Sequence, residues 1–176
     1  MATETTVRAT RYEAIIATLV GVSALFVSGY TAYVQRQQVR ATVWPILEYS
    51  TSNDPRVRFV VANKGVGPAI IGHVLVRVDG EPVRTWNQAL RKLIGPGEHH
   101  FTQSTISGHT FSPGESMDVM TPHDSAALDR ERGRVAVEIC YCSTLGDCWT
   151  LRSGRDGNST TETRTCPEPS ASTFQE

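Results

Sequence analysis

Apolar and polar positions follow three different patterns along this chain. Residues 14–34, AIIATLVGVSALFVSGYTAYV, form a run of 21 residues without a charged side chain. After residue 42, short runs alternate between apolar and polar residues, which is the pattern of strands covered on one face. From residue 153 the chain is polar and has no apolar period, which predicts a mobile tail. We therefore divide the chain into an N-terminal cytoplasmic segment (1–13), an apolar helix (14–34), a linker (35–41), a β domain (42–152) and a polar C-terminal tail (153–176).

The apolar run is long enough to cross a membrane. A helix of this length would extend about 31 Å, close to the thickness of bilayer hydrocarbon. A cleaved signal peptide is the main alternative, because Val22-Ser23-Ala24 and Val39-Arg40-Ala41 both end in a small residue. The first would leave a short apolar core before the cut, and the second needs an apolar core longer than signal peptides have. We expect an uncleaved anchor.

Small residues recur along this helix at steps of three or four. Such a ridge would let a second helix approach closely, either in a homodimer or in a larger membrane complex. The small side chains are common in membrane helices, so an unpaired helix also remains open. The residues of the ridge are Ala17, Gly21, Ala24, Ser28 and Ala32.

The β domain is punctuated by turn residues. Residues 56–62 and 69–78 read as strands, and Asp79-Gly80 predicts a tight turn after the second. In that second strand we expect Gly72 on the same face as Val74, Val76 and Val78. The segment TWNQALRKLIGPG, by contrast, has helical spacing and ends in turn residues. About seven short strands with one inserted helix predict a mainly β fold, an immunoglobulin-like β-sandwich.

The segment VVANKGVGPAIIGHVLVRVDG resembles the strand-turn-strand signature of bacterial immunoglobulin-like modules. Together with the leading helix, residues 42–152 resemble membrane-anchored bacterial proteins that carry such a domain outside the cytoplasm. The resemblance implies a fold and an extracytoplasmic setting, and it carries over no catalytic residue. End loops and sheet edges are where such domains recruit partners. The residues that we expect to bind a partner are Asn63, Lys64, Gly65, Val66, Gly67, Pro68, Trp44 and Tyr49.

Three of the four cysteines lie within ICYCSTLGDCWTL. If its two halves form a hairpin closed by residues 143–147, Tyr141 faces Trp149 and Cys142 faces Cys148. Opposed residues in an antiparallel ladder have Cα atoms roughly 4.5–5.5 Å apart, within the range that a disulfide needs. We predict the disulfide Cys142–Cys148, with Cys140 left to hold the tail through Cys166. Four cysteines allow three connectivities, so the others remain open.

The cysteines also bear on compartment. Zinc is an alternative, but Cys140-x-Cys142-x5-Cys148 lacks the usual spacing of a zinc knuckle. Two arginines flank the apolar helix on each side, so the positive-inside rule does not fix its orientation. Because disulfides form in oxidising compartments, paired cysteines favour a bacterial inner membrane with the N-terminus in the cytoplasm and the domain in the periplasm.

Candidate chemistry elsewhere is sparse. His99 and His100 could bind a metal, but adjacent strand residues point to opposite faces. Asp124, Asp129 and Glu131 are acidic, yet they match no calcium loop. TFSPGES lacks the strand and helix around a nucleophile elbow, so we read it as a turn. Asn158-Ser159-Thr160 is a glycosylation sequon, which matters only in a glycosylating secretory pathway.

These observations favour binding over catalysis. With 17 basic and 18 acidic residues, the chain lacks the positive balance that nucleic acid attracts. We expect a non-catalytic single-pass membrane protein, without metal or cofactor, whose domain serves protein–protein interaction or envelope assembly. An accessory subunit that packs its anchor against a larger membrane complex is one alternative, and a membrane-tethered metal-dependent hydrolase is another.

Overall fold

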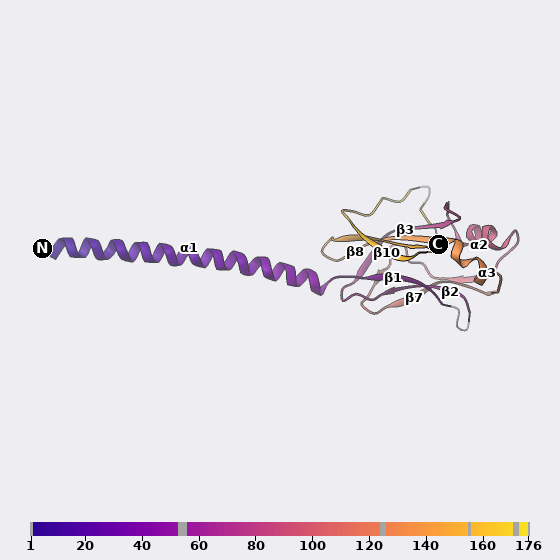
Figure 1. Cartoon of the computed structure of the whole chain (residues 1–176), viewed down its shortest axis with the longest axis horizontal. Helices are drawn as coiled ribbons and strands as arrows, with labels where there is room; N and C mark the ends of the chain where they lie inside the picture. Colours follow the sequence, from indigo (N-terminus) through magenta and orange to yellow (C-terminus); the bar gives the residue numbers. More distant parts are fainter. Residues whose placement is uncertain (1, 53–55, 124–125, 155, 171–172, 176) are drawn as a thin grey trace. The chain divides into compact units, whose positions relative to one another are not determined.

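The computed structural model describes residues 2–52, 56–123, 126–154, 156–170 and 173–175 (Figure 1). The chain divides into two compact units, Met1–Ala41 and Thr42–Glu176. The first is the helix α1 (Ala2–Thr42), which begins before and ends after the predicted apolar segment. Its part Tyr12–Thr42 has the length and apolar composition of a membrane anchor or a signal sequence, and its most apolar window is fully exposed. No other helix in the described part of the chain has these properties.

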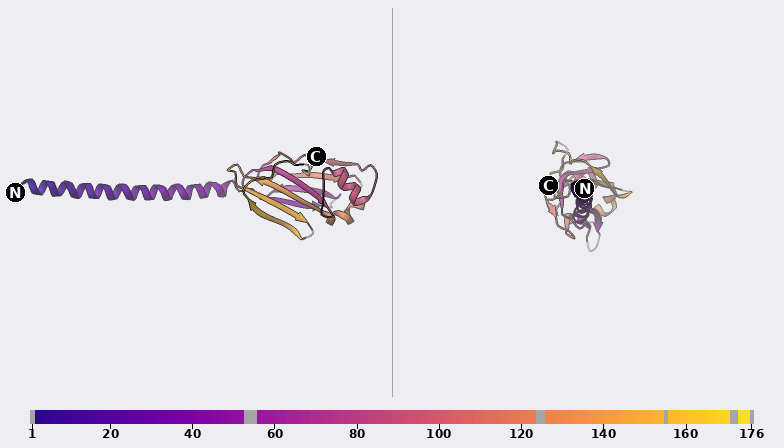
Figure 2. Two further views of the ribbon diagram at one scale, coloured as in Figure 1. Left: turned by 90° about the horizontal axis from the view of Figure 1, so that it is seen from above. Right: turned by 90° about the vertical axis from the view of Figure 1, so that its left-hand side faces the viewer.

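The second unit consists of two antiparallel sheets that face each other as a sandwich, with short helices added (Figure 2). The strands of the first sheet are, in spatial order, β1 (Leu47–Ser52), β2 (Arg58–Asn63), β7 (Ser116–Pro122) and β5 (Phe101–Gln103). The strands of the second are β10 (Gly157–Thr163), β9 (Cys148–Gly154), β8 (Val135–Cys142), β3 (Ala69–Val78) and β4 (Glu81–Val83), while β6 (Thr110–Phe111) also pairs with β3. The expectation of a β-rich domain built from two sheets is therefore confirmed.

The predicted helix is α2 (Trp86–Ile94), and its sequence explains both its start and its burial. The Thr85 hydroxyl caps the first turn by accepting a hydrogen bond from the Gln88 backbone N–H at 3.2 Å. Trp86, Leu90 and Leu93 recur at helical spacing, and all three are buried. The shorter α3 (Ala126–Glu131) lies at the same end of the sandwich (Figure 1). Together these helices cover one end of the core.

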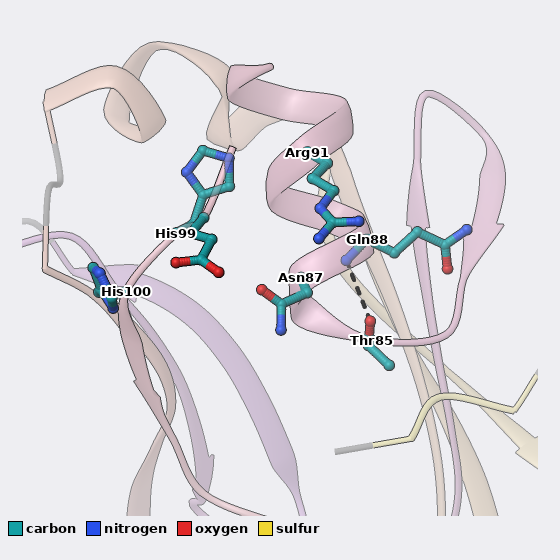
Figure 3. Close-up of a pocket in the computed structure, with 7 residues that line it drawn as sticks. Thr85, Asn87, Gln88, Arg91, His99 and His100 are labelled. Carbon is teal, nitrogen blue, oxygen red and sulfur yellow. Dashed lines mark hydrogen bonds between the residues drawn. The ribbon is translucent and has the colours of Figure 1, made fainter. Parts of the chain in front are cut away.

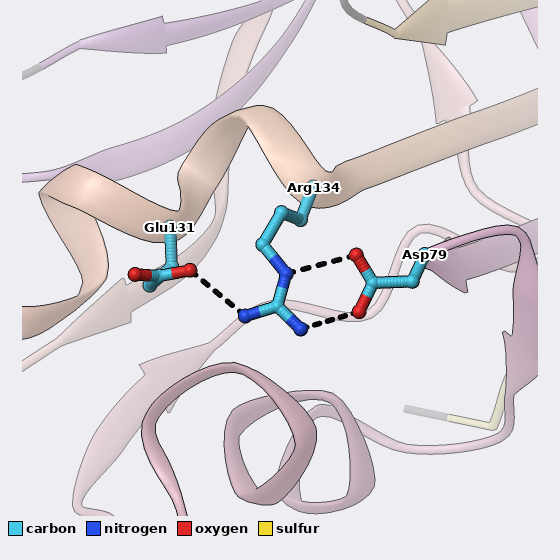
Figure 4. Close-up of polar contacts among 3 residues, drawn as sticks. All are labelled: Asp79, Glu131 and Arg134. Carbon is cyan, nitrogen blue, oxygen red and sulfur yellow. Dashed lines mark hydrogen bonds and ion pairs between the residues drawn. The ribbon is translucent and has the colours of Figure 1, made fainter.

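The turn Asp79-Gly80 joins β3 to β4 as the sequence predicts, with both residues at positive φ. A 3₁₀ turn, Arg132–Arg134, precedes β8. Its last residue, Arg134, forms hydrogen bonds with Asp79 and so stabilises the β3–β4 turn (Figure 4). Its guanidinium donates to both carboxylate oxygens of Asp79 and, at 2.8 Å, to Glu131. These hydrogen bonds raise the pKa of Arg134, with the larger effect from Asp79 and the smaller from Glu131. The acidic run that suggested calcium thus contributes to ion pairs, since Asp129 contacts Arg132 at 3.4 Å; Asp124 lies outside the described residues.

The alternation of β3 is interrupted at Gly72. The sequence predicted Gly72 on the face of Val74, but the register with β8 shifts between Ile71 and His73. Because of this bulge, Ile71 and Val74 both reach the core, while Gly72 is exposed. A Cβ atom at Gly72 would lie 2.9 Å from the Cβ atom of Cys166. The bulge therefore makes room for the C-terminal segment.

The C-terminal segment differs most from its prediction. We expected a mobile tail, but β10 pairs along β9, with Thr160 opposite Leu151. Further on, Phe174 is 2% exposed and packs edge-to-face against Trp86, with ring centroids 5.0 Å apart. The Phe174 backbone N–H also donates to the Val74 carbonyl at 3.0 Å. This segment belongs to the folded unit rather than to a tail.

Candidate interaction surface

The segment Asn63–Pro68 was expected to face a partner, yet Asn63, the last residue of β2, is buried and bonds several backbone groups. Asn63 is fully buried, and its side-chain oxygen accepts from the backbone N–H groups of Ile46 at 3.2 Å and Gly65 at 3.0 Å. Its side-chain nitrogen donates to the carbonyl oxygens of Gly67 at 2.8 Å and Phe111 at 3.1 Å. A buried side chain with all these bonds satisfied fixes the loops around it.

The two glycines of this loop approach the segment that leads from α1 into β1. The N–H groups of Val66 and Gly67 both donate to the Trp44 carbonyl, at 3.0 and 3.2 Å. A Cβ atom at Gly67 would lie 2.0 Å from the Val43 carbonyl oxygen, and one at Gly65 would lie 2.4 Å from the Trp44 oxygen. The loop therefore clamps the start of the domain, a role that requires glycine because two backbones meet.

Not all of the expected binding residues are accessible. Tyr49 is 8% exposed and packs in the core, where burial raises the pKa of its phenol. Asn63 and Gly67 are also buried, and Gly65 and Pro68 are half-buried. Trp44, Lys64 and Val66 remain exposed. The accessible part of the predicted surface is thus smaller than the sequence suggested.

The large exposed apolar side chains of the second unit gather at one end of the sandwich. Five such residues are 40–64% exposed among the described residues after 42. They come from the segment before β1, the β2–β3 loop, the start of β3 and the β8–β9 turn, which the strand registers place at the same end. We call this surface the apolar end, and its residues are Trp44, Ile46, Val66, Ile70 and Leu145.

Aromatic stacking fixes part of the apolar end. The ring of Trp44 stacks on that of Trp149, with centroids 6.4 Å apart, and Trp149 lies 5.9 Å from Tyr141. Tyr141 is buried, Trp149 is half-buried and Trp44 is exposed. The three neighbouring rings therefore connect the core with the surface. Sequence reasoning identified Trp44 and Val66 but missed Ile46, Ile70 and Leu145. An apolar residue inside the polar turn STLGD was a signal that could have identified Leu145.

The cysteine hairpin has the register expected from the sequence, with Tyr141 opposite Trp149 and Cys142 opposite Cys148. The structure contains the disulfides Cys142–Cys148 and Cys140–Cys166, with Cα atoms 4.0 and 5.5 Å apart. The sulfurs of Cys142, Cys148 and Cys166 lie within 4.8 Å of one another, as ligands of a metal would. In this structure all four sulfurs are bonded in disulfides, so they are not present as the thiolates that bind a metal.

Far from the apolar end, an open cavity of about 490 Å³ lies beside α2 (Figure 3). Its polar lining includes Arg91 and Asn87 from α2 and His99 and His100 from the segment before β5. The two histidines make different contacts: the His99 ring bonds the Gly95 carbonyl at 2.9 Å, and His100 lies near His123, with ring centroids 6.4 Å apart.

The TFSPGES segment forms the turn that leads into β7. Glu115 accepts hydrogen bonds from the Ser112 backbone N–H at 2.7 Å and from the His109 ring at 2.9 Å. These two contacts, the Ser112 bond first, lower the pKa of Glu115. Glu115 thus joins His109 to the Ser112 backbone and closes this turn.

The sequon residue Asn158 contributes to the contact between the sheets. Its side chain lies on the edge strand β10 and donates to the Tyr49 carbonyl of β1 at 2.8 Å. The small-residue ridge of α1 lies on exposed helix, and a Cβ atom at Gly21 would meet nothing within 4 Å beyond the neighbouring backbone of its own helix.

No protein-family model, curated protein or solved structure matches this chain. The function must therefore be inferred from the geometry of the chain itself.

Proposed function

We propose that the protein is a single-pass membrane protein whose β-sandwich binds another protein through the apolar end. The observation that carries this proposal is the gathering of the exposed large apolar side chains of the second unit at one end of the sandwich. Contiguous exposed apolar side chains mark interaction surfaces more often than isolated ones do. The partner is a protein of the same membrane or a second copy of this chain, and the role is binding rather than catalysis.

We further propose that the sandwich is immunoglobulin-like. In immunoglobulin domains the strands A, B, E and D form one sheet and G, F and C form the other. The spatial order β1-β2-β7-β5 reproduces the first sheet, and β9-β8-β3 reproduces the second, with β4 in the place of C′. β6 and β10 are additions to this plan. The likeness supports a binding role, because end loops of such domains commonly recruit partners.

The proposed location is the bacterial inner membrane, with the domain in the periplasm. Its support is the pairing of all four cysteines, since disulfides persist in oxidising compartments. Fusing a phosphatase or a fluorescent protein after residue 176 tests the orientation. Phosphatase activity with a dark fluorescent fusion is expected, and the reverse would contradict the periplasmic location.

Photo-crosslinking in intact cells tests the binding role. A benzophenone amino acid replaces Trp44, Val66 or Leu145 in the full-length chain, and Glu81 or Lys92 at the far end serves as the matched control. We expect a discrete protein adduct from the apolar end and none from the controls, with mass spectrometry separating a second copy from a different protein. Equal adducts from both ends, or adducts to lipid alone, would refute the proposed surface.

A second candidate is an accessory subunit that acts through α1. The exposed ridge of small residues on that helix favours it. Replacing residues 14–34 with an unrelated apolar helix of equal length discriminates the two. If the crosslinks from the apolar end persist after this replacement, the domain carries the binding; if they vanish while the protein stays in the membrane, the helix does.

A further inference from the structure

The two disulfides of the domain are in direct contact. The Sγ atom of Cys142 lies 3.7 Å from the Sγ atom of Cys166, although each is bonded to a different cysteine. The sulfurs of Cys142, Cys148 and Cys166 form a triangle with no side longer than 4.8 Å. A thiolate at any corner would therefore lie close to a disulfide sulfur, and such proximity is the first requirement of thiol–disulfide exchange.

This contact depends on features from three parts of the chain. Cys142 and Cys148 face each other across the β8–β9 hairpin, while Cys166 arrives from the segment after β10. The bulge at Gly72 receives it, because a Cβ atom there would lie 3.0 Å from the Cys166 sulfur. Cys142 and Cys166 are half-buried, whereas Cys140 and Cys148 are 1% and 5% exposed. An external thiol therefore meets the two touching cysteines first.

We propose that these bridges form a thiol–disulfide exchange site whose substrate is a dithiol. One thiolate of the dithiol attacks the sulfur of Cys166, and Cys140 leaves as a thiolate. The second thiol of the dithiol then attacks its own sulfur in this mixed disulfide, so that Cys166 leaves as a thiolate and the dithiol becomes a disulfide. The bridge Cys140–Cys166 has gained two electrons, the dithiol has lost two, and the thiolates take up protons from water.

The freed Cys166 thiolate then attacks the neighbouring sulfur of Cys142. The bond Cys142–Cys148 breaks, the bond Cys142–Cys166 forms, and Cys148 leaves as a thiolate that takes a proton. This step involves no net oxidation or reduction, because one S–S bond forms as one breaks. Because the sulfurs form a compact triangle, Cys166 must rotate to line up behind the Cys142–Cys148 bond, and cleavage of its own bridge permits that rotation.

The product keeps one bridge between the hairpin and the C-terminal segment. Phe174 therefore stays tethered to the core, while Cys148 gains a thiol at the edge of the exposed β8–β9 turn. This activity goes beyond the proposed binding role and does not depend on it. It would give the domain a free thiol at Cys148 while one bridge still holds the C-terminal segment.

Three single variants of the full-length protein test the exchange without added reductant. Cys140→Ser leaves Cys166 unpaired, and Cys148→Ser leaves Cys142 unpaired. After alkylation and peptide mapping, we expect the label of the first variant to be shared roughly equally between Cys166 and Cys148, as bridges of similar stability would allow. In the Cys148→Ser protein, we expect the label to be shared between Cys142 and Cys140. Label confined to Cys166 in the first and to Cys142 in the second overturns the proposal.

Cys166→Ser is the matched control, because it leaves Cys140 unpaired and removes the touching sulfur. We expect its label on Cys140 alone, and spread of the label to Cys142 or Cys148 would mean general reshuffling and overturn the specific exchange. The wild-type protein provides a test that needs no variant to fold. With one equivalent of dithiothreitol, part of the protein should carry alkylated Cys140 and Cys148 together with the bridge Cys142–Cys166, and the rest should carry alkylated Cys140 and Cys166. Alkylation of Cys140 and Cys166 alone, with no Cys142–Cys166 bridge recovered, would refute the migration.

Discussion

The side-chain oxygen of Asn63 accepts a hydrogen bond from the backbone N–H of Ile46, 3.2 Å away. The contact joins the end of β2 to the segment that precedes β1. The Asn63 side chain also bonds the carbonyls of Gly67 and Phe111. A residue expected to face a partner therefore holds the fold together at the end where the proposed surface lies.

Replacing Asn63 with alanine should destabilise the domain strongly. The change leaves several buried backbone groups without partners, and each such group costs about 1–3 kcal/mol. We expect a loss of about 3 kcal/mol in the free energy of unfolding, measured by urea denaturation of the full chain in mild detergent. Lys64→Ala, at the exposed neighbouring position, should change it by less than about 0.5 kcal/mol. Equal effects of the two substitutions would show that the buried hydrogen bonds of the Asn63 side chain do not stabilise the fold.

Gly67→Ala tests the close approach of the two backbones. The new Cβ atom would lie 2.0 Å from the Val43 carbonyl oxygen, so the loop must move and lose its bonds to Trp44. We expect a loss of more than about 4 kcal/mol, or failure to accumulate folded protein. The control is Gly133→Ala, where an added Cβ atom meets nothing within 4 Å. A Gly67→Ala protein as stable as the Gly133→Ala protein would refute the clamp.

Tyr49 and Tyr141 offer a matched pair of hydroxyl deletions. The Tyr49 hydroxyl is buried and has no hydrogen-bond partner among the described residues, whereas the Tyr141 hydroxyl accepts from the Leu47 backbone N–H at 3.5 Å. Tyr49→Phe should leave the free energy of unfolding unchanged or raise it by up to about 1 kcal/mol, because it removes an unpaired polar group. Tyr141→Phe should lower it by about 1 kcal/mol. Thermal unfolding of both variants measures the two changes. A Tyr141→Phe protein more stable than the Tyr49→Phe protein would contradict these hydrogen-bond assignments.

Local patterns in the sequence predicted the elements whose contacts are local. The hairpin register around Cys142 and Cys148 follows from pairing apolar with apolar residues across one turn. The capped α2 and the tight turn at Asp79 also follow from neighbouring residues. Each of these elements is specified by fewer than about 15 consecutive residues, so pattern and turn chemistry are sufficient.

Contacts between distant segments were not predictable in the same way. The polar composition of β10 gives no apolar alternation, since it lies on a sheet edge and its residues are mostly exposed. A lone Phe174 in a polar segment shows no periodicity, and its burial depends on contacts with Trp86 and with β3, which are distant in the sequence. The bulge at Gly72 likewise depends on where Cys166 lies. The apolar end became visible only when four separate segments were brought together.

Glu115 should contribute to the acid sensitivity of the fold. Hydrogen bonds from Ser112 and His109 lower its pKa below the ordinary value of 4.5. The unfolded chain then binds this proton more readily than the folded one, so the stabilisation is present above about pH 4.5 and is lost as the pH falls through the folded pKa. Wild-type protein should therefore be more stable than Glu115→Gln at pH 7, and the difference should shrink towards pH 3. Melting curves across this range test it, and a difference that stays constant would exclude the linkage.

Phe174→Ala tests whether the C-terminal segment is part of the core. The ring is 2% exposed and packs against Trp86, which itself stacks on Phe59 with ring centroids 5.7 Å apart. Removing a buried phenylalanine ring leaves a cavity and costs about 3–5 kcal/mol. Gln175→Ala is the control, because Gln175 is exposed and its bond to the Arg84 carbonyl comes from the backbone. We expect urea midpoints to fall sharply for Phe174→Ala and to stay near wild type for Gln175→Ala. If both variants unfold like the wild type, the segment contributes nothing to stability and the original interpretation as a mobile tail would be correct.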